Sequence, residues 1–421
     1  MESMITLGID RMEIDWGKNH TFINHSILFT ENDIKQIPYY YLDDETDSEI
    51  VQYKEGLSCK LSIIKTRLNL IGYSMIECKN KYDEFLHECF QYGMNINLDF
   101  DAFYNIIVNI DVSKFNTPLL EYEDYENGYD LGEFARKCIL GEKEIRDNFL
   151  DYYSNDSFKM LYDLELFFEN LNPYIILRLL AENKEIQDLE VFWSYSDVVE
   201  RGWVSKDEIL KFSKESIPKI IVVTEGSSDT FVLKKTIDTL FPEISHMFQF
   251  IDMQENYPFT GIGNLYNFCC GLIKIGIINP MIVIFDNDTA GLEKYEKLMK
   301  MPQLNNLLIT KLPNYPDFSS IETVGPQGES VENINGLAVS IECFLDFSGH
   351  NPQVRWTSYN DKMKCYQGAL INKDSYVSDF KSANLLDGSY KTEKLIVLIK
   401  YLLNEWETRN TVTAKGSAVQ P

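Results

Sequence analysis

The chain has 421 residues, and its 39 basic and 65 acidic residues give a formal net charge of −26. Hydrophobic residues make up 44% of it, so it can bury a large core, and intrinsic disorder is excluded. So acidic a chain repels nucleic acid in bulk, which counts against a protein that merely coats DNA. The balance reverses locally, because residues 351–400 hold eight Lys or Arg against five acids.

The chain shows no sign of a membrane or an export route. No apolar run approaches the roughly 18 to 20 residues of a membrane span. The N-terminus lacks a basic segment followed by an apolar stretch, and the eight cysteines show no Cys-x-x-Cys pair or metal-ligand spacing. We therefore expect a cytoplasmic protein with reduced thiols and no contact with a membrane.

The first half of the chain alternates between strand and helix signals. Residues 1 to about 55 show the alternation of strands and turns, and apolar residues at helical spacing follow. The helices are expected over residues 57–78, 82–93, 132–152 and 159–182, with a break or restart at Asn172-Pro173. Residues 183–216 resemble a connector with a short helix at 205–213. We thus expect residues 1–200 to form a mainly helical regulatory or dimerisation domain preceded by a few strands.

From residue 217 the pattern changes to short apolar strands separated by helices. Strands are expected at 217–224, 247–251, 281–285 and 307–312, with helices at 228–240, 264–275 and 289–300. This alternation predicts an α/β domain, a parallel sheet with helices on both faces. Residues 313–336 are rich in Pro, Gly and Asn and predict a long loop. We expect this domain to span 215–347, with a mixed extension at 348–410 that includes a helix near 393–406.

Acidic residues follow two of these strands. Glu225 comes directly after the first strand, and Asp286 and Asp288 come after the third. Ligands bind at the carboxyl ends of the strands in an open parallel sheet. Two residues apart on an extended chain, Asp286 and Asp288 point to the same side. Converging carboxylates suit Mg²⁺, although acids also favour helix N-termini, which would explain Asp229 or Asp288 taken singly.

The two acidic motifs resemble the TOPRIM domain of topoisomerases, primases, OLD-type nucleases and several phage-defence effectors. The matching residues are Thr224-Glu225-Gly226-Ser227-Ser228-Asp229 and, about sixty residues later, Phe285-Asp286-Asn287-Asp288-Thr289-Ala290-Gly291. The resemblance implies that Glu225 is a general acid/base or metal ligand. It implies that Asp286 and Asp288 bind Mg²⁺ or Mn²⁺, with Asp229 as a further ligand or a group that supports the ligands.

Two later residues are further candidates, because OLD-like TOPRIM nucleases place more acids and a Lys after the core motifs. Glu342 lies in the otherwise apolar Ser340–Leu345 segment and could complete a second metal site, or it could belong to an ordinary amphipathic segment. Lys373, in the mildly basic region, is a catalytic candidate that could contact phosphate, although the pattern favours a solvated surface residue.

The N-terminal half resembles the N-terminal region of HEPN/Toprim-associated bacterial proteins. The resemblance rests on Ile14-Asp15-Trp16-Gly17-Lys18-Asn19, on Asn24-His25 and on the helix from Lys60 to Ile71. HEPN ribonucleases pair an Arg with a His a turn or two later. None of the arginines in the expected helices has such a His, namely Arg67, Arg136, Arg146 and Arg178. We therefore expect a scaffold without ribonuclease activity of its own.

Together these resemblances imply a metal-dependent nuclease that acts on DNA or RNA, in bacterial defence against phage. The chain contains no ATP-binding motif, since Gly261 and Gly263 are not followed by Gly-Lys-Ser/Thr. A partner ATPase or sensor is therefore expected, as is a homo-oligomer. The alternative is a non-catalytic TOPRIM and helical scaffold that assembles with such a partner.

Overall fold

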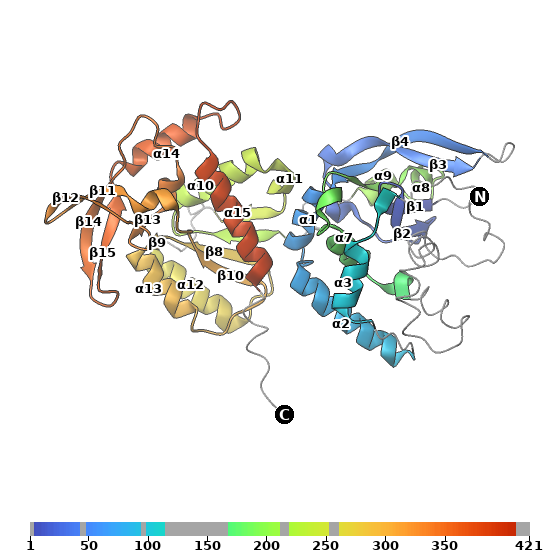
Figure 1. The fold of residues 1–421 in the computed structure, drawn as a ribbon, viewed down its shortest axis with the longest axis horizontal. Helices are drawn as coiled ribbons and strands as arrows, with labels where there is room; N and C mark the ends of the chain where they lie inside the picture. The colour runs from blue at the N-terminus through green and yellow to red at the C-terminus, as the bar shows by residue number, and fades with distance from the viewer. Residues whose placement is uncertain are drawn as a thin grey trace. The chain divides into compact units, whose positions relative to one another are not determined.

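The computed structural model describes residues 4–42, 48–93, 98–113, 167–210, 219–251 and 261–409. The chain divides into two compact units, Met1–Ile217 and Pro218–Pro421 (Figure 1). The helix expected at residues 132–152, with Arg136 and Arg146, lies outside the described residues. No helix among the described residues is long and apolar enough to cross a membrane.

The N-terminal unit contains a five-stranded antiparallel sheet in the order β2-β1-β5-β4-β3. Its strands are β1 (Met4–Ile9), β2 (Met12–Lys18), β3 (Ile34–Leu42), β4 (Glu49–Lys60) and β5 (Glu190–Ser194). The sequence predicted strands and turns up to about residue 55, in agreement with β1 to β4, but it placed β5 in a connector. β5 follows the helices and pairs with both β1 and β4, so the expectation of a helical domain merely preceded by strands was wrong. The segment Glu190–Ser194 has three apolar residues in a row and no alternation, which does not distinguish a strand from a connector.

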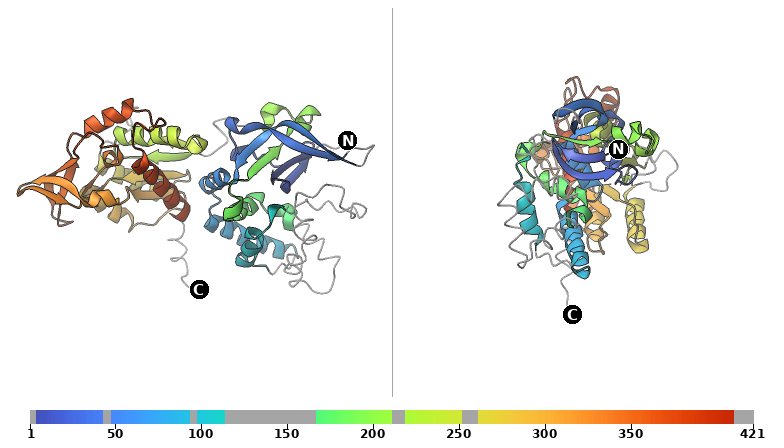
Figure 2. Two further views of the ribbon diagram at one scale, coloured as in Figure 1. Left: turned by 45° about the horizontal axis from the view of Figure 1, so that its top comes forward. Right: turned by 90° about the vertical axis from the view of Figure 1, so that its right-hand side faces the viewer.

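A layer of helices lies beside this sheet (Figures 1 and 2). The longer helices are α1 (Leu61–Leu70), α2 (Met75–Gln91), α3 (Phe100–Val108) and α7 (Pro173–Leu180), and the short ones are α8 (Ser196–Glu200) and α9 (Lys206–Ile209). α1 begins later than predicted, because Leu57 to Lys60 pair with β5 instead. The predicted restart at Asn172-Pro173 is confirmed, since the Asn172 side chain caps α7 and proline occupies its first turn.

The C-terminal unit is built on a parallel sheet in the order β10-β8-β6-β7. Its strands are β6 (Ile220–Val223), β7 (Phe248–Phe250), β8 (Met281–Phe285) and β10 (Leu307–Lys311). The helices after these strands are α10 (Ser227–Leu240), the short α11 (Pro242–Ser245), α12 (Ile262–Ile275) and α13 (Thr289–Leu298). The predicted parallel sheet with intervening helices is therefore confirmed.

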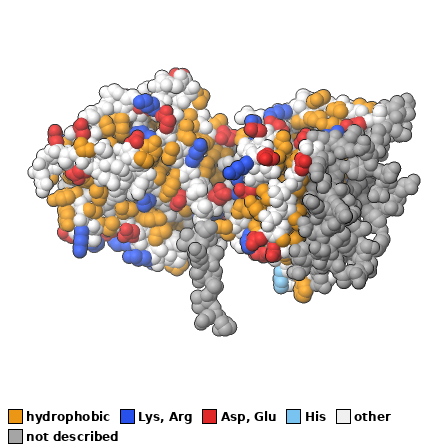
Figure 3. Space-filling model, viewed as in Figure 1, with side chains coloured by type: hydrophobic (Ala, Val, Ile, Leu, Met, Phe, Trp, Pro, Cys, Tyr) orange, Lys and Arg blue, Asp and Glu red, His pale blue; other side chains and the backbone are white. Residues whose placement is uncertain are grey.

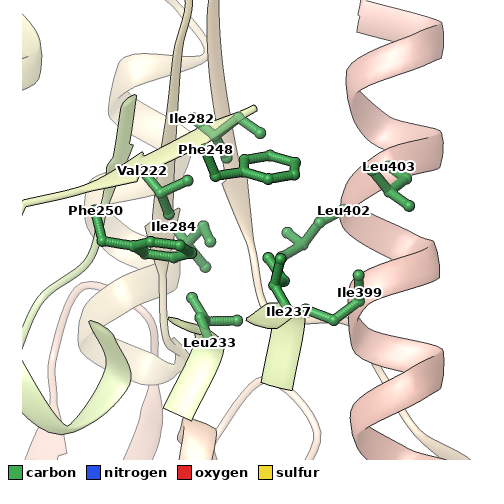
Figure 4. Close-up of a pocket in the computed structure, with 10 residues that line it drawn as sticks. All are labelled: Val222, Leu233, Ile237, Phe248, Phe250, Ile282, Ile284, Ile399, Leu402 and Leu403. Atoms are coloured by element: carbon green, nitrogen blue, oxygen red, sulfur yellow. The ribbon is translucent and has the colours of Figure 1, made fainter. Parts of the chain in front are cut away.

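Both faces of the parallel sheet are covered (Figure 1). Val223 and Val283 pack in a buried cluster with residues of α12 and α13. Their strand neighbours Val222 and Ile282 face a pocket lined by α10 and by α15 (Glu393–Thr408), as Figure 4 shows. This pocket of about 20 Å³ is lined only by apolar side chains and is large enough for about one water molecule. It is therefore a packing defect of the core and no ligand site.

The loop predicted at residues 313–336 was wrong in part, because it contains a hairpin. The strands β11 (Ile321–Gly325) and β12 (Gly328–Glu332) pair antiparallel, and the sheet continues through β14 (Gln353–Asn360) and β15 (Cys365–Leu370). Exposure explains the error, since all of β12 is solvent-exposed and its polar residues hide the strand pattern. The helix α14 (Lys373–Ser382) and α15 complete the mixed C-terminal region.

Candidate active site

The acidic residues stand at the carboxyl ends of neighbouring parallel strands. Glu225 follows β6, and Asp286 follows β8, whose continuation forms the short β9 (Asn287–Asp288). β6 and β8 are paired in register, with Val223 opposite Val283, so both strands end at the same edge of the sheet. The local sequence and the pairing together bring the two motifs to one edge.

The turn after β6 is held by hydrogen bonds within the motif. The N–H of Gly226 donates to Oδ2 of Asp229 at 3.0 Å, and the Ser228 hydroxyl donates to its Oδ1 at 3.3 Å. The hydroxyl of Thr224 lies 2.9 Å from that of Thr230, one turn into α10. Asp229 thus fixes the start of α10 from the third helical position, by accepting a hydrogen bond from the N–H of the N-cap residue Gly226.

The second motif is held from two sides. The N–H of Gly291 donates to Oδ1 of Asp288 at 2.7 Å, and Gln367 of β15 donates from Nε2 to its Oδ2. A side chain on Gly291 would place Cβ 2.1 Å from the carbonyl oxygen of Asp286, so only glycine fits here. The glycine of the motif therefore allows α13 to begin directly behind Asp286.

The residue between the two aspartates points elsewhere. Asn287 is fully buried, and its Oδ1 accepts a hydrogen bond at 3.1 Å from Nζ of Lys311, at the end of β10. Its Nδ2 donates to Oδ1 of Asn314 at 2.7 Å. Burial lowers the pKa of Lys311. This network anchors the middle of the Asp-x-Asp motif to the neighbouring strand.

Glu342 joins the cluster from a different part of the chain. It lies in the 3-10 turn η10 (Ile341–Phe344), is 3% exposed, and accepts a hydrogen bond from the Ser340 hydroxyl at 2.6 Å. Lys373, the first residue of α14, places its Nζ 4.0 Å from Oε1 of Glu342. The Lys373 side chain is 57% exposed, so it stands at the rim and not in the interior.

The same turn is held from behind by Lys394 of α15. Its Nζ donates to the carbonyl of Cys343 at 2.7 Å and lies 3.7 Å from the centre of the Phe347 ring. Burial lowers the pKa of this ammonium group to about 8. Lys394 therefore fixes the backbone next to Glu342 from a nearly dry position.

The carboxylates act on one another electrostatically. Burial, and after it the charge of Asp288, raise the pKa of Glu225 to about 7. The N–H of Ile262, at the start of α12, and the Lys373 ammonium oppose this rise. Burial also raises the pKa of Asp288, against the hydrogen bonds from Gly291 and Gln367.

The pKa shifts of Asp229 and Asp286 show that the acids of both motifs and Glu342 interact electrostatically. Burial raises the pKa of Asp229 to about 7, with a contribution from the charge of Glu342. Burial raises the pKa of Asp286 well above its ordinary value, and four carboxylates raise it further: those of Asp229, Asp288, Glu225 and Glu342. The pKa of Asp286 is thus raised by the charge of every other acid of the cluster. The structure thus couples the five acids electrostatically, and Lys373 lies 4.0 Å from one of them, Glu342.

The donor set suits a hard divalent cation. Mg²⁺ takes oxygen ligands and is commonly bound by one or two protein carboxylates together with water and substrate phosphate. Carboxylates whose charge is disfavoured by burial and by like neighbours are compensated by such a cation. Among the described residues, no three His, Cys, Asp or Glu side chains stand close enough to hold one ion by themselves. The cluster therefore fits an ion that is shared with water and substrate.

Sequence reasoning missed two residues that hold this cluster in place. Gln367 lies on a strand 79 residues beyond Asp288, and Lys394 lies 51 residues beyond Cys343. Gln367 also accepts a hydrogen bond from the N–H of Ala290 at 2.9 Å. Nothing in the local sequence of either residue signals such a contact, because both depend on how β15 and α15 pack.

The residues behind the N-terminal resemblance form a buried polar link. Nε2 of His25 lies 2.7 Å from Oδ2 of Asp15 on β2, and its Nδ1 lies 3.2 Å from the hydroxyl of Tyr174 on α7. The His25 ring is 1% exposed and packs edge-on against Trp193 of β5. This histidine therefore ties the sheet to α7 from within the core.

Two of the four arginines tested above for a ribonuclease pair, Arg67 and Arg178, are described by the structure, and both have structural partners. Nη1 of Arg67 donates to the Leu28 carbonyl at 2.8 Å and to Oδ2 of Asp33 at 2.7 Å. Nε of Arg178 donates to Oδ1 of Asn69 at 2.7 Å. Both arginine side chains are fully buried. These hydrogen bonds give both arginines a structural role inside the N-terminal unit.

Comparison with known proteins bears on the N-terminal half. The family model of the HEPN/Toprim N-terminal domain 1 matches residues 1–216. No curated protein and no solved structure matches the chain. The matched segment covers more than half of the 421 residues and coincides with the N-terminal unit. The chain therefore belongs to the HEPN/Toprim N-terminal domain 1 family.

Proposed function

We propose that the C-terminal unit is a TOPRIM-type, Mg²⁺- or Mn²⁺-dependent nuclease that cleaves phosphodiester bonds in DNA or RNA. One observation carries the proposal. At the edge of a parallel sheet, the charges of four other carboxylates act on the buried carboxyl group of Asp286 and raise its pKa. The family of the N-terminal half, which joins the HEPN and Toprim names, supports a nuclease-related role. Perturbed pKa values clustered at strand ends are typical of functional sites.

Each residue has a role in this proposal. Asp286 and Asp288 would bind a metal ion together with water and substrate phosphate, and Asp229 and Glu342 would serve as further ligands, of this ion or a second one, or support it through their charge. When bound, the ion would neutralise phosphodiester charge and stabilise the oxygens that change charge. With its pKa of about 7, Glu225 is suited to move a proton as general acid or base near neutral pH.

Lys373 completes the arrangement from the rim. Its exposed ammonium lies beside Glu342, where it would attract the phosphate of an approaching strand as a point charge. Its charge also lowers the pKa of Glu225, so it favours the ionised form of that acid. Lys373 would thus contribute to substrate binding and to the protonation state of Glu225.

The wider context is part of the same proposal. We extend the proposal to bacterial defence against phage in the cytoplasm, which the resemblance to TOPRIM effectors implies. A homo-oligomer, assembled with a partner ATPase or sensor, would supply the trigger. If the acids serve assembly alone, the protein is a non-catalytic scaffold for that partner.

A cleavage assay separates these two functions. Purified protein is incubated with plasmid, single-stranded DNA and tRNA, in Mg²⁺, in Mn²⁺ and in EDTA. We expect metal-dependent cleavage that Asp286→Asn abolishes. The matched control is Asp238→Asn, which removes the same charge from an exposed position on α10. Cleavage by Asp286→Asn at the wild-type rate would place the active site elsewhere, and no cleavage by the wild type with its partner present would favour the scaffold.

A further inference from the structure

The hairpin of β14 and β15 carries an exposed aromatic pair. Tyr359 and Tyr366 are opposite one another across the two strands, and their ring centres are 5.1 Å apart in an edge-on arrangement. The side chains are 51% and 47% exposed, which is unusual for two large rings side by side. Rings in such a pair can stabilise the hairpin by their contact alone, but that does not require so much exposed surface.

The strand that carries Tyr366 is attached to the Asp-x-Asp motif through its backbone and through the neighbouring Gln367. Tyr366 precedes Gln367, the residue whose side chain donates to Asp288. The carbonyl of Tyr366 accepts a hydrogen bond at 2.9 Å from the hydroxyl of Thr289, which follows Asp288 in the chain. The hairpin is therefore attached to the Asp-x-Asp motif at two successive residues of β15.

The charge of the hairpin is opposite to that of the chain. Residues 353–370 contain three basic side chains, Arg355, Lys362 and Lys364, against the single acid Asp361, whereas the whole chain has a net charge of −26. The three basic side chains are all exposed. Lys362 also approaches Oε1 of Glu293 at 3.3 Å. On the face drawn in Figure 3, Lys and Arg side chains lie along the lower left edge, where Figure 1 draws the β14–β15 loop and α13.

The acids of this sheet lie on its other strands. Glu322 belongs to β11, and Glu329 and Glu332 belong to β12, the strand farthest from β15 in the sheet order. Positive charge and aromatic surface thus belong to β14, β15 and the turn between them, and β15 is the edge strand that contacts the Asp-x-Asp motif.

We propose that the β14–β15 hairpin is a binding platform for single-stranded nucleic acid, on which Tyr359 and Tyr366 stack unpaired bases while Lys362, Lys364 and Arg355 contact phosphates. The inference rests on the nuclease function and specifies its substrate class. Stacking requires bases that are free of a duplex, and it is tolerant of sequence because every base has an aromatic face. The platform holds a strand beside the acids that would cleave it.

Binding is measured by fluorescence anisotropy with labelled 20-nucleotide single strands of DNA and RNA, in Mg²⁺, on the Asp286→Asn background. We expect Tyr359→Ala and Tyr366→Ala each to weaken binding on the order of tenfold. The Phe variants at both positions should bind like the parent, because the ring is kept. Tyr53→Ala removes a tyrosine that is 70% exposed on β4 and serves as the matched control. Melting curves verify that each variant is folded.

The cations are tested separately. Lys364 has a left-handed backbone with φ of 55°, so Lys364→Asn removes the charge and keeps a residue that tolerates this conformation. Together with Arg355→Gln it should weaken binding at low salt. It should also reduce the salt dependence, because a protein that contacts fewer phosphates releases fewer counterions when it binds. An unlabelled duplex of the same sequence should compete far less well than the single strand.

The outcomes distinguish the platform from the nuclease. If both Ala variants bind single strands like the parent, or if the duplex competes equally well, the platform is wrong even when metal-dependent cleavage is found. If the Ala variants change only the oligomeric mass in light scattering, the rings belong to a protein interface and the platform is again wrong. If binding depends on both rings but no metal supports cleavage, the platform stands and the nuclease function fails.

Discussion

Gln367 of β15 donates a hydrogen bond from Nε2 to Oδ2 of Asp288, across 79 residues of sequence. The contact joins the exposed hairpin to the carboxylate cluster, and the Gly291 N–H occupies the other carboxylate oxygen at 2.7 Å. Asp288 is therefore oriented by one donor from its own helix and by one from a separate sheet. This arrangement makes the geometry of the acid dependent on where β15 lies.

Replacing Gln367 by Ala should weaken metal binding. The hydrogen bond from Gln367 lowers the pKa of Asp288, so its loss favours the protonated carboxyl and frees its rotation. Loss of a group that orients a metal ligand typically costs roughly 10- to 100-fold in affinity. Isothermal titration with Mn²⁺ measures the effect, and Gln353→Ala on β14 is the control. Equal Mn²⁺ affinities for Gln367→Ala and wild type would show that Asp288 needs no such support.

Stability without metal should fall as the pH rises. The pKa values of Glu225 and Asp229 are raised to about 7 in the folded state, from 4.5 and 3.8. Between these limits the folded state holds protons that the unfolded state has lost, so the slope of unfolding free energy with pH is negative. The contribution is complete below about pH 4 and is lost progressively through pH 7.

Urea unfolding in EDTA between pH 5 and 8 tests this sign. Saturating Mg²⁺ should flatten the profile, because a bound cation favours the ionised carboxylates that high pH produces. The Glu225→Gln variant should show a shallower fall than wild type in EDTA. A metal-free wild type that gains stability from pH 5 to 8 would contradict the raised pKa values.

Asp286→Asn should stabilise the metal-free protein. The substitution removes one charge from a cluster in which four other carboxylates disfavour it. At pH 8 the variant should therefore unfold at a higher temperature than the wild type, because the mutual repulsion of the carboxylates is relieved. In Mg²⁺ the advantage should vanish, because the wild type gains stability from the ion and the variant does not. Paired melting curves in EDTA and in Mg²⁺ give both numbers, and a lower melting temperature for the variant in EDTA would count against the repulsive cluster.

Lys394→Met should alter how stability depends on pH above neutrality. The pKa of Lys394 is lowered from 10.5 to about 8, so between these values the unfolded state binds a proton that the folded state lacks. This contribution to stability therefore rises from pH 8 to 10 in the wild type, and Met, which keeps the apolar stem, removes the rise. Differences in unfolding free energy between the two proteins at pH 7, 8.5 and 10 measure it. Lys391→Met, at an exposed neighbouring position, should leave the profile unchanged.

The N-terminal unit should have no ribonuclease activity of its own. His25 is buried against Asp15 and Tyr174, and Arg67 is bound to Asp33, so these side chains stabilise the fold. The Asp286→Asn protein, incubated with tRNA in EDTA, should leave the RNA intact over hours. Metal-independent cleavage under these conditions would reveal a site in the N-terminal half, which a fragment of residues 1–200 would then localise.

The sequence by itself was sufficient for the parallel sheet and for the position of its acids. Strands β6 and β8 are short apolar runs, and the residues after them are acidic, so Glu225 and Asp286 could be placed at strand ends without any tertiary information. Strands buried on both faces have this signature because every side chain must be apolar. Gly291 belongs to the same motif, and its necessity became visible only from its contact with the Asp286 carbonyl.

Only the tertiary structure decided which distant residues complete and support the cluster. β5 and the β11–β12 hairpin were missed, because short or exposed strands lack a periodic signal and form through their partners. Glu342 could be named as a candidate but not distinguished from an amphipathic segment, and Gln367 could not be named at all. Their positions depend on the packing of η10 and β15 against the sheet, a non-local property that no run of neighbouring residues encodes.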